Sequence, residues 1–151
     1  MSTKVTSALE IATEMAERQR DGARHALRDV RASAAAAHEQ MEQLQTYAGE
    51  TQDRWGMRAG ASVAPEVLFH HRHFMGRLDH AMELQSKVLA DHTQRVLASE
   101  GALLATELRL ATLKKLLSKR QSEKELVERR RDQKQTDERA QLALRSQLQE
   151  H

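Results

Sequence analysis

The chain has 151 residues, a formal net charge of +2 and no cysteine. Ala, Leu, Arg, Glu and Lys account for 80 of the 151 residues, a composition typical of long or coiled-coil helices. One proline and four aromatic residues argue against a β-sandwich, which needs frequent turns and many aromatic and β-branched side chains. Without cysteine no disulfide can form, so we expect a reducing compartment such as the cytoplasm. No apolar run is longer than that of residues 34–37, and a run of this length is too short for a transmembrane helix or a signal peptide.

Helix-breaking residues concentrate between Trp55 and Pro65, which predicts two helices joined by a loop. We expect the first helix over residues 3–54, the loop over 55–64 and the second helix over 65–148. Pro65 suits the first turn of a helix, because its missing N–H would have no partner there. A later start of the first helix at Ser7 stays open, since Ser7 and Glu10 have the spacing of a capping box.

The first helix carries two neighbouring stripes of residues at alternating steps of three and four, the spacing of a coiled-coil seam. One stripe consists of Val5, Leu9, Ala12, Ala16, Gln19, Ala23, Ala26, Val30, Ser33, Ala37, Gln40, Leu44 and Tyr47. The other consists of Leu27, Val30, Ala34, Ala37, Met41, Leu44 and Ala48. We favour the second stripe as the seam, which leaves Gln40 and Tyr47 beside it.

The second helix carries one such stripe, which is narrow and interrupted by polar residues. It consists of Phe74, Leu78, Ala81, Gln85, Val88, His92, Val96, Ser99, Leu103, Thr106, Leu110, Leu113 and Leu117. These patterns predict an all-α fold, a long antiparallel two-helix coiled-coil hairpin that forms a single domain. The second helix is the longer and would overhang the first by about thirty residues. A turn at Gly101 would instead give a three-helix bundle, but the stripe continues in phase through Gly101.

Two regions of the chain have distinctive side chains. All four aromatic residues, Tyr47, Trp55, Phe69 and Phe74, lie around the predicted loop, where they either plug the end of the hairpin or bind a partner. Charge is also divided: residues 36–85 have a net charge of −3 and five His, whereas residues 109–131 have a net charge of +6. The basic stretch is either a solvated helix face or a surface for an acidic partner.

The sequence offers no catalytic or metal-binding constellation. His70 and His73 share a helix face, but no third ligand of fixed spacing accompanies them, so we expect no metal and no cofactor. Nucleophile motifs and phosphate-binding glycine loops are missing from the sequence, and two packed helices do not form the concave pocket of an active site. We therefore expect that the protein is not an enzyme.

Two segments resemble a known family. Residues 70–85, HHRHFMGRLDHAMELQ, resemble the aromatic-x-Arg-x-Phe-Leu-x-x-Leu-x-x-Ala-Ile-x-x-Gln segment of the FliJ family of flagellar type III export. Residues 128–140, ERRRDQKQTDERA, resemble that family's Glu-x-Arg-x-Glu-Gln-Lys-x-x-Asp-Glu-x-Ala signature. This sequence departs from the pattern at three positions: Met82 replaces the usual Ile, His71 stands where an aromatic residue is common, and Asp132 replaces a common Glu.

The resemblance implies partners as well as a fold. FliJ proteins are antiparallel coiled coils similar to the central stalk of rotary ATPases. Their open end enters the hexameric ring of the export ATPase FliI and promotes its assembly and activity. A patch nearer the loop contacts the export-gate protein FlhA, and family members also handle export chaperones. The resemblance thus implies a cytoplasmic protein, peripherally associated with the export apparatus at the inner membrane without inserting into it.

Carried over by motif, the gate-binding residues would be Gln40, Leu44, Tyr47, Thr51, Phe74, Leu78, Ala81 and Gln85. From the charge pattern and the second motif, we expect the ATPase to be bound by Lys114, Lys115, Lys119, Arg120, Arg129, Arg130, Arg131, Gln133, Lys134, Asp137 and Glu138.

Two other classes of function stay open at this point. One is the equivalent stalk protein of a virulence type III secretion system. The other is a nucleic-acid-binding or scaffolding coiled coil, which would use residues 109–131 along phosphates. Against nucleic acid, Glu123, Glu125 and Glu128 interrupt this stretch and no aromatic residue accompanies it, so we expect no nucleic-acid partner. The oligomeric state stays open as well.

Overall fold

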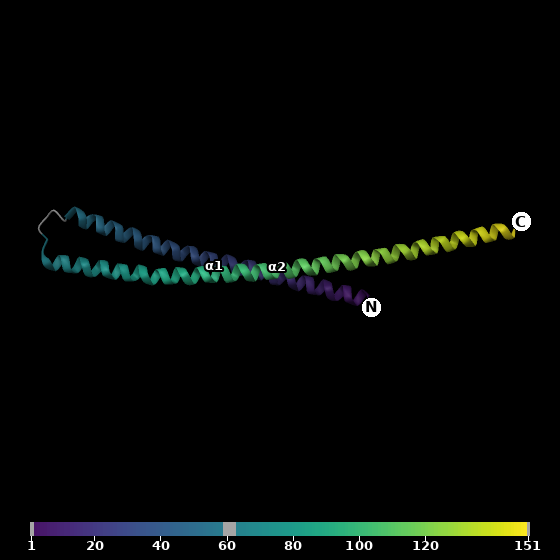
Figure 1. Ribbon diagram of the computed structural model, residues 1–151, viewed down its shortest axis with the longest axis horizontal. Helices are drawn as coiled ribbons and strands as arrows, with labels where there is room; N and C mark the ends of the chain where they lie inside the picture. Colours follow the sequence, from purple (N-terminus) through teal and green to yellow (C-terminus); the bar gives the residue numbers. More distant parts are fainter. Residues whose placement is uncertain (1, 59–62, 151) are drawn as a thin grey trace. The chain divides into compact units, whose positions relative to one another are not determined.

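The computed structural model describes residues 2–58 and 63–150. It contains two α-helices, α1 (Ser2–Arg58) and α2 (Pro65–Gln149), and the described residues include no strand (Figure 1). The predicted all-α fold of two long packed helices is therefore confirmed. Helix α2 begins at Pro65 as expected and continues through Gly101, so the three-helix alternative is wrong.

The predicted limits of the first helix need correction at both ends. Helix α1 begins at Ser2, which excludes a start at Ser7, and it ends at Arg58, four residues beyond the predicted end. The later end has a physical reason, because the ring of Trp55 stacks on His71 of α2 and holds the last turn of α1 against α2. Residues 59–62 of the predicted loop lie outside the described residues.

Residues in mutual contact divide the chain into two compact units. We call residues 21–105 the hairpin unit and residues 1–20 with 106–151 the terminal unit. That the chain forms a single domain stays a prediction. Neither helix contains, in the described residues, a stretch long and apolar enough to cross a membrane.

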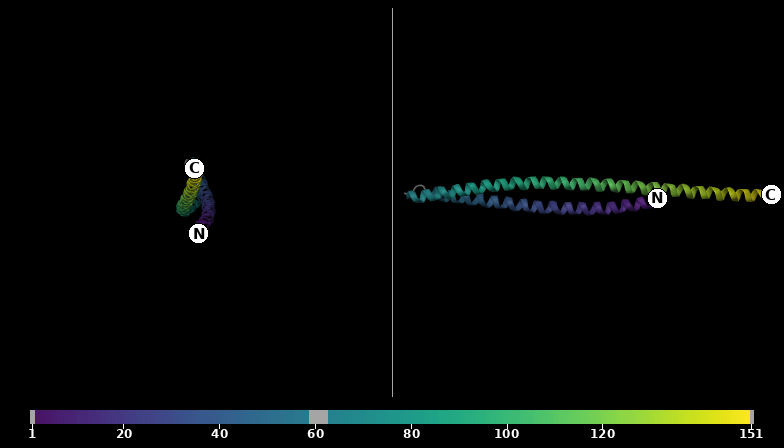
Figure 2. Two further views of the ribbon diagram at one scale, coloured as in Figure 1. Left: turned by 90° about the vertical axis from the view of Figure 1, so that its right-hand side faces the viewer. Right: turned by 90° about the horizontal axis from the view of Figure 1, so that it is seen from below.

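In the hairpin unit, α1 and α2 run antiparallel and lie side by side, as both Figure 1 and the right-hand view of Figure 2 show. The buried side chains on α1 are Leu27 and Ala37, with exposed fractions of 5% and 4%. From Leu27 to Ala48, the half-buried residues are Val30, Ala34, Met41, Leu44 and Ala48. This is the second of the two predicted stripes, so our preference between the two is confirmed.

The stripe on α2 is confirmed at every predicted position except one. Val88 is 42% exposed, and Leu89 takes its place as the half-buried residue. The error has a simple cause: the seam advances four residues from Gln85 at this point, whereas we predicted a step of three. Gln85 is a polar member of the seam whose Nε2 donates to the backbone oxygen of Ala37 at 2.8 Å, across the two helices.

The terminal unit has a similarly small core. Ala16 and Leu110 are 2% and 4% exposed, and Thr13 is 7% exposed while its hydroxyl donates to the backbone oxygen of Leu9. From residue 118 to the end of α2, every residue is exposed, which confirms the predicted overhang of the second helix. Few large side chains are buried in the described part of either unit. Each buried side chain therefore contributes a sizeable share of the free energy of unfolding.

Candidate partner-binding surfaces

The predicted gate-binding residues lie within the seam of the hairpin unit and directly beside it, and we call them the tip patch. Residues of both helices form this patch and contact one another. The rings of Tyr47 and Phe74 meet edge to face, with their centroids 5.9 Å apart, a favourable geometry for aromatic pairs. Gln85 bridges the helices a few turns away, because its Nε2 lies 3.3 Å from Oε1 of Gln40. The structure thus brings the two predicted halves of the patch together.

The members of the tip patch differ in how much surface they offer. Tyr47 is 50% exposed and Gln40 is exposed as well, so both can contact a partner. Leu78 is only 8% exposed and belongs to the core of the hairpin unit. The remaining residues, Leu44, Thr51, Phe74, Ala81 and Gln85, are half-buried. A partner would therefore meet the flank of the seam, and Leu78 would act by supporting that flank.

Aromatic and histidine rings pair near the ends of the two helices that face the loop. The imidazole of His71 lies flat on the indole of Trp55, with centroids 4.0 Å apart and an interplanar angle of 4°. On the other side of α2, Phe69 stacks on His73 at 6.2 Å and meets His70 edge to face. Phe69 is 67% exposed. The Trp55–His71 contact ties α1 to α2, whereas the ring of Phe69 is largely exposed and stacks only on side chains of α2.

The role of His71 was missed from the sequence, where His71 was noted only as a departure from the family's pattern. Its position is nevertheless readable from the pattern. Extending the α1 stripe beyond Ala48 by three and then four residues leads to Thr51 and Trp55, and His71 precedes Phe74, the first residue of the α2 stripe, by three. In the described part of the chain, no three His, Asp or Glu side chains gather as metal ligands would.

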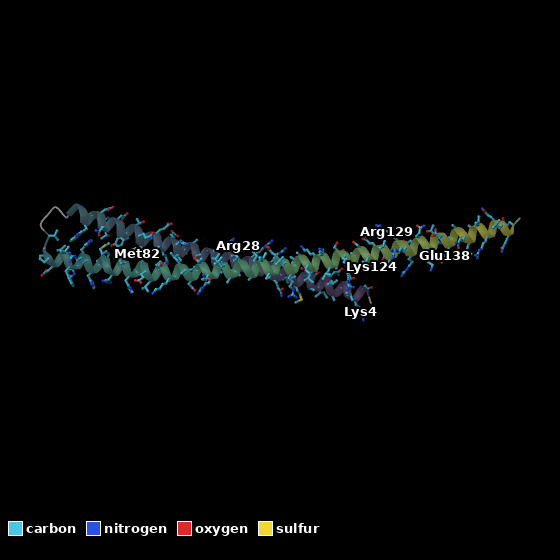
Figure 3. All side chains as sticks on the ribbon, viewed as in Figure 1. Lys4, Arg28, Met82, Lys124, Arg129 and Glu138 are labelled. Atoms are coloured by element: carbon cyan, nitrogen blue, oxygen red, sulfur yellow. The ribbon has the colours of Figure 1, made fainter. Side chains whose placement is uncertain are left out.

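The predicted ATPase-binding residues lie on α2 in the terminal unit, and all of them are exposed. We call residues 109–131 the basic segment. Lys114 lies opposite α1, with its Nζ 3.8 Å from a carboxylate oxygen of Glu17. The residues from Lys119 onward follow Leu117, the last half-buried residue of the seam. In Figure 3 the side chains around Glu138 project from α2 with no second helix beside them.

A shallow groove lies where α1 begins. It has a volume of about 350 Å³ and is lined by Thr6 of α1 and by Arg120, Lys124, Val127 and Arg131 of α2, together with Glu123 and Glu128. Farther along α2, the side-chain amide of Gln133 donates to Asp137 at 3.2 Å, so two predicted ATPase-binding residues contact each other. The groove offers a partner one apolar side chain among three cations and two carboxylates.

These features define an α-helical coiled-coil hairpin protein whose predicted partner-binding residues, apart from the buried Leu78, offer exposed or half-buried side chains on the helices. A family model described as "Flagellar FliJ protein" matches residues 6–149, and the chain therefore belongs to the FliJ family. The flagellar FliJ protein of Salmonella typhi is 29% identical over 136 residues, which cover 90% of this chain and 92% of that relative. No solved structure matches the chain. Membership of this family makes the chain a flagellar export protein and favours flagellar over virulence secretion.

Proposed function

We propose that this protein is a non-enzymatic component of the flagellar export apparatus that links the export ATPase FliI to the gate protein FlhA. The basic segment would bind in the ATPase ring and promote its assembly and activity, and the tip patch would bind FlhA. Export chaperones would be further partners. The protein would work in the cytoplasm, peripherally associated with the apparatus at the inner membrane.

The observation that carries the ATPase assignment is the bare end of α2. Residues 118–149 remain helical although every one of them is exposed, and they include Arg129, Arg130 and Arg131 in succession. A helical segment whose residues are all exposed gains little stability from tertiary packing, the usual source of helix stability in proteins. A partner that surrounds it would supply that packing, and a partner with acidic surfaces would also neutralise its charge.

The test measures ATP hydrolysis by the purified FliI ring with increasing amounts of this protein. We expect stimulation by the parent chain and a loss of most of it when Arg129, Arg130 and Arg131 are all replaced by Ala. A matched control replaces Arg18, Arg28 and Lys87 by Ala, which removes the same charge from exposed positions elsewhere on the helices. Absence of stimulation by the parent, or equal stimulation by both variants, would refute the assignment.

The FlhA assignment rests on the exposed edge of the tip patch. Tyr47 is half-exposed and held in place by Phe74, so it resembles the preordered aromatic residues that dominate many interfaces. We expect Tyr47→Ala to weaken binding to the cytoplasmic domain of FlhA by about tenfold, the equivalent of about 1.4 kcal/mol. Phe69→Ala is the matched control, since it removes an aromatic ring that is even more exposed but lies outside the patch. Equal weakening by the two variants would contradict the assignment.

A further inference from the structure

One stretch of α2 exposes apolar side chains on the side that faces away from α1. Between residues 96 and 105 the only charged residue is Glu100, although charged residues make up 30% of the chain. The carboxylate of Glu100 accepts a hydrogen bond from Arg31 at 3.3 Å and so points toward α1. Leu97 and Leu104 point away from α1 and are 55% and 58% exposed. We call the surface formed by Leu97, Ala98, Gly101, Leu104 and Ala105 the outer face.

Gly101 lies at the centre of the outer face. A Cβ atom added at Gly101 would meet no atom of this chain within 4 Å, so packing within the chain does not require glycine here. Glycine in a helix interior costs about 1 kcal/mol relative to Ala. Its lack of a side chain does let another helix approach the backbone closely.

The residues around Gly101 have a self-complementary order. One helical row runs from Leu97 through Gly101 to Ala105, and the other runs from Ala98 through Gly101 to Leu104. A twofold axis through Gly101 exchanges the ends of each row. It therefore places each Leu97 against Ala105 of the second copy and each Leu104 against Ala98 of the second copy, large against small.

We infer that a second copy of this chain docks antiparallel on the outer face, with the two helices crossing at Gly101. Closed pairs of identical chains need such a self-complementary surface, because each residue must meet the symmetry-related position. The charges allow the pairing, since the axis sets Glu100 against Ala102 of the second copy rather than against the second Glu100.

The area of the outer face sets the strength of the pairing. Each copy contributes two leucine side chains and three small residues, less than the roughly 800 Å² per partner of a stable complex. The pair is therefore weak and forms only at high protein concentration. This pairing is independent of the proposed binding to FliI and FlhA, because it uses neither the basic segment nor the tip patch.

The test is analytical ultracentrifugation of the full chain from about 5 to about 500 µM. We expect reversible monomer–dimer exchange, weakened at least tenfold by Leu104→Gln and also weakened by Gly101→Ala. Gly76→Ala is the matched control, since Gly76 lies in the same helix and also has open space around it. Circular dichroism checks that each variant remains helical. A parent chain that is monomeric throughout the range, or equal dimerisation of Gly101→Ala and Gly76→Ala, overturns the inference.

The orientation of the pair can be tested because the chain contains no cysteine. We would oxidise Ala98→Cys protein, Leu104→Cys protein and an equal mixture of the two. An antiparallel pair places residue 98 of one copy beside residue 104 of the other, so the mixture should cross-link more completely than either variant alone. Cross-linking that is as complete in the separate variants as in the mixture would overturn the antiparallel arrangement.

Discussion

Leu27 offers a direct measure of how much the thin seam of the hairpin unit contributes to stability. Its side chain is 5% exposed, whereas most of the α1 seam around it is alanine. Replacing Leu27 by Ala removes three carbon atoms from an almost fully buried position, which corresponds to about 2.4 kcal/mol of lost transfer free energy. A cavity between two helices can close by a small movement, so the further cavity cost should be low. Alanine also favours helix slightly. We expect a net loss of about 2 kcal/mol.

The assay is urea unfolding followed by circular dichroism, at a few micromolar protein so that self-association does not contribute. The free energy of unfolding follows from the midpoint and the slope of the transition. Leu84→Ala is the matched control in the same unit, because Leu84 is 49% exposed and should lose only about 1 kcal/mol. Equal losses for the two leucines would refute the reasoning, since burial in the seam would then not decide the cost.

Three further predictions concern single residues. Gln85→Ala removes the hydrogen bond to the backbone oxygen of Ala37 and should lower the free energy of unfolding by about 1 kcal/mol, measured in urea. His71→Ala uncovers one face of Trp55 and should shift its fluorescence emission to longer wavelength; Trp55 is the only tryptophan, so the signal is unambiguous. Gly22→Ala should raise the free energy of unfolding by about 0.5–1 kcal/mol, because a Cβ atom at this position meets nothing and alanine favours helix.

Each of these predictions has its own control or contrary result. Gln94→Ala removes the same side chain from an exposed position of α2 and should leave stability nearly unchanged. An unshifted emission in His71→Ala, or the same shift in His70→Ala, would show that His71 does not cover Trp55. A loss of stability in Gly22→Ala would mean that another group needs the open space at this glycine.

The architecture was predictable because its main determinants are local in the sequence. Pro65 can begin a helix but cannot continue one, so its position specified the start of α2. The seam on α2 was readable because its apolar residues keep a regular spacing over many turns. On α1 the seam was ambiguous, since Val30, Ala37 and Leu44 belong to both stripes. Several other seam positions are alanine, whose hydrophobicity differs little from that of the polar residues beside it. Burial in the structure resolves this ambiguity.

The candidate surfaces were predictable to a lesser extent. Residue types and spacing indicated which residues would gather near the loop, and the contact between Tyr47 and Phe74 agrees with that expectation. Sequence spacing could not tell which members would be covered, because the division between Tyr47 and Leu78 depends on a small rotation of each helix about its axis. The outer face around Gly101 was not recognised from the sequence, since a coiled-coil analysis looks only for residues that face the partner helix.

The uncovered end of α2 has a consequence for the lifetime of the protein in the cell. A helical segment that buries no side chain opens at little cost in free energy, and open backbone is what proteases cleave. Residues 118–149 are also rich in arginine and lysine. Copies without the proposed ATPase partner should therefore be degraded from this end first, whereas the proposed binding to the ATPase would protect it. The amount of this protein would then follow the amount of its partner, without any need for matched rates of synthesis.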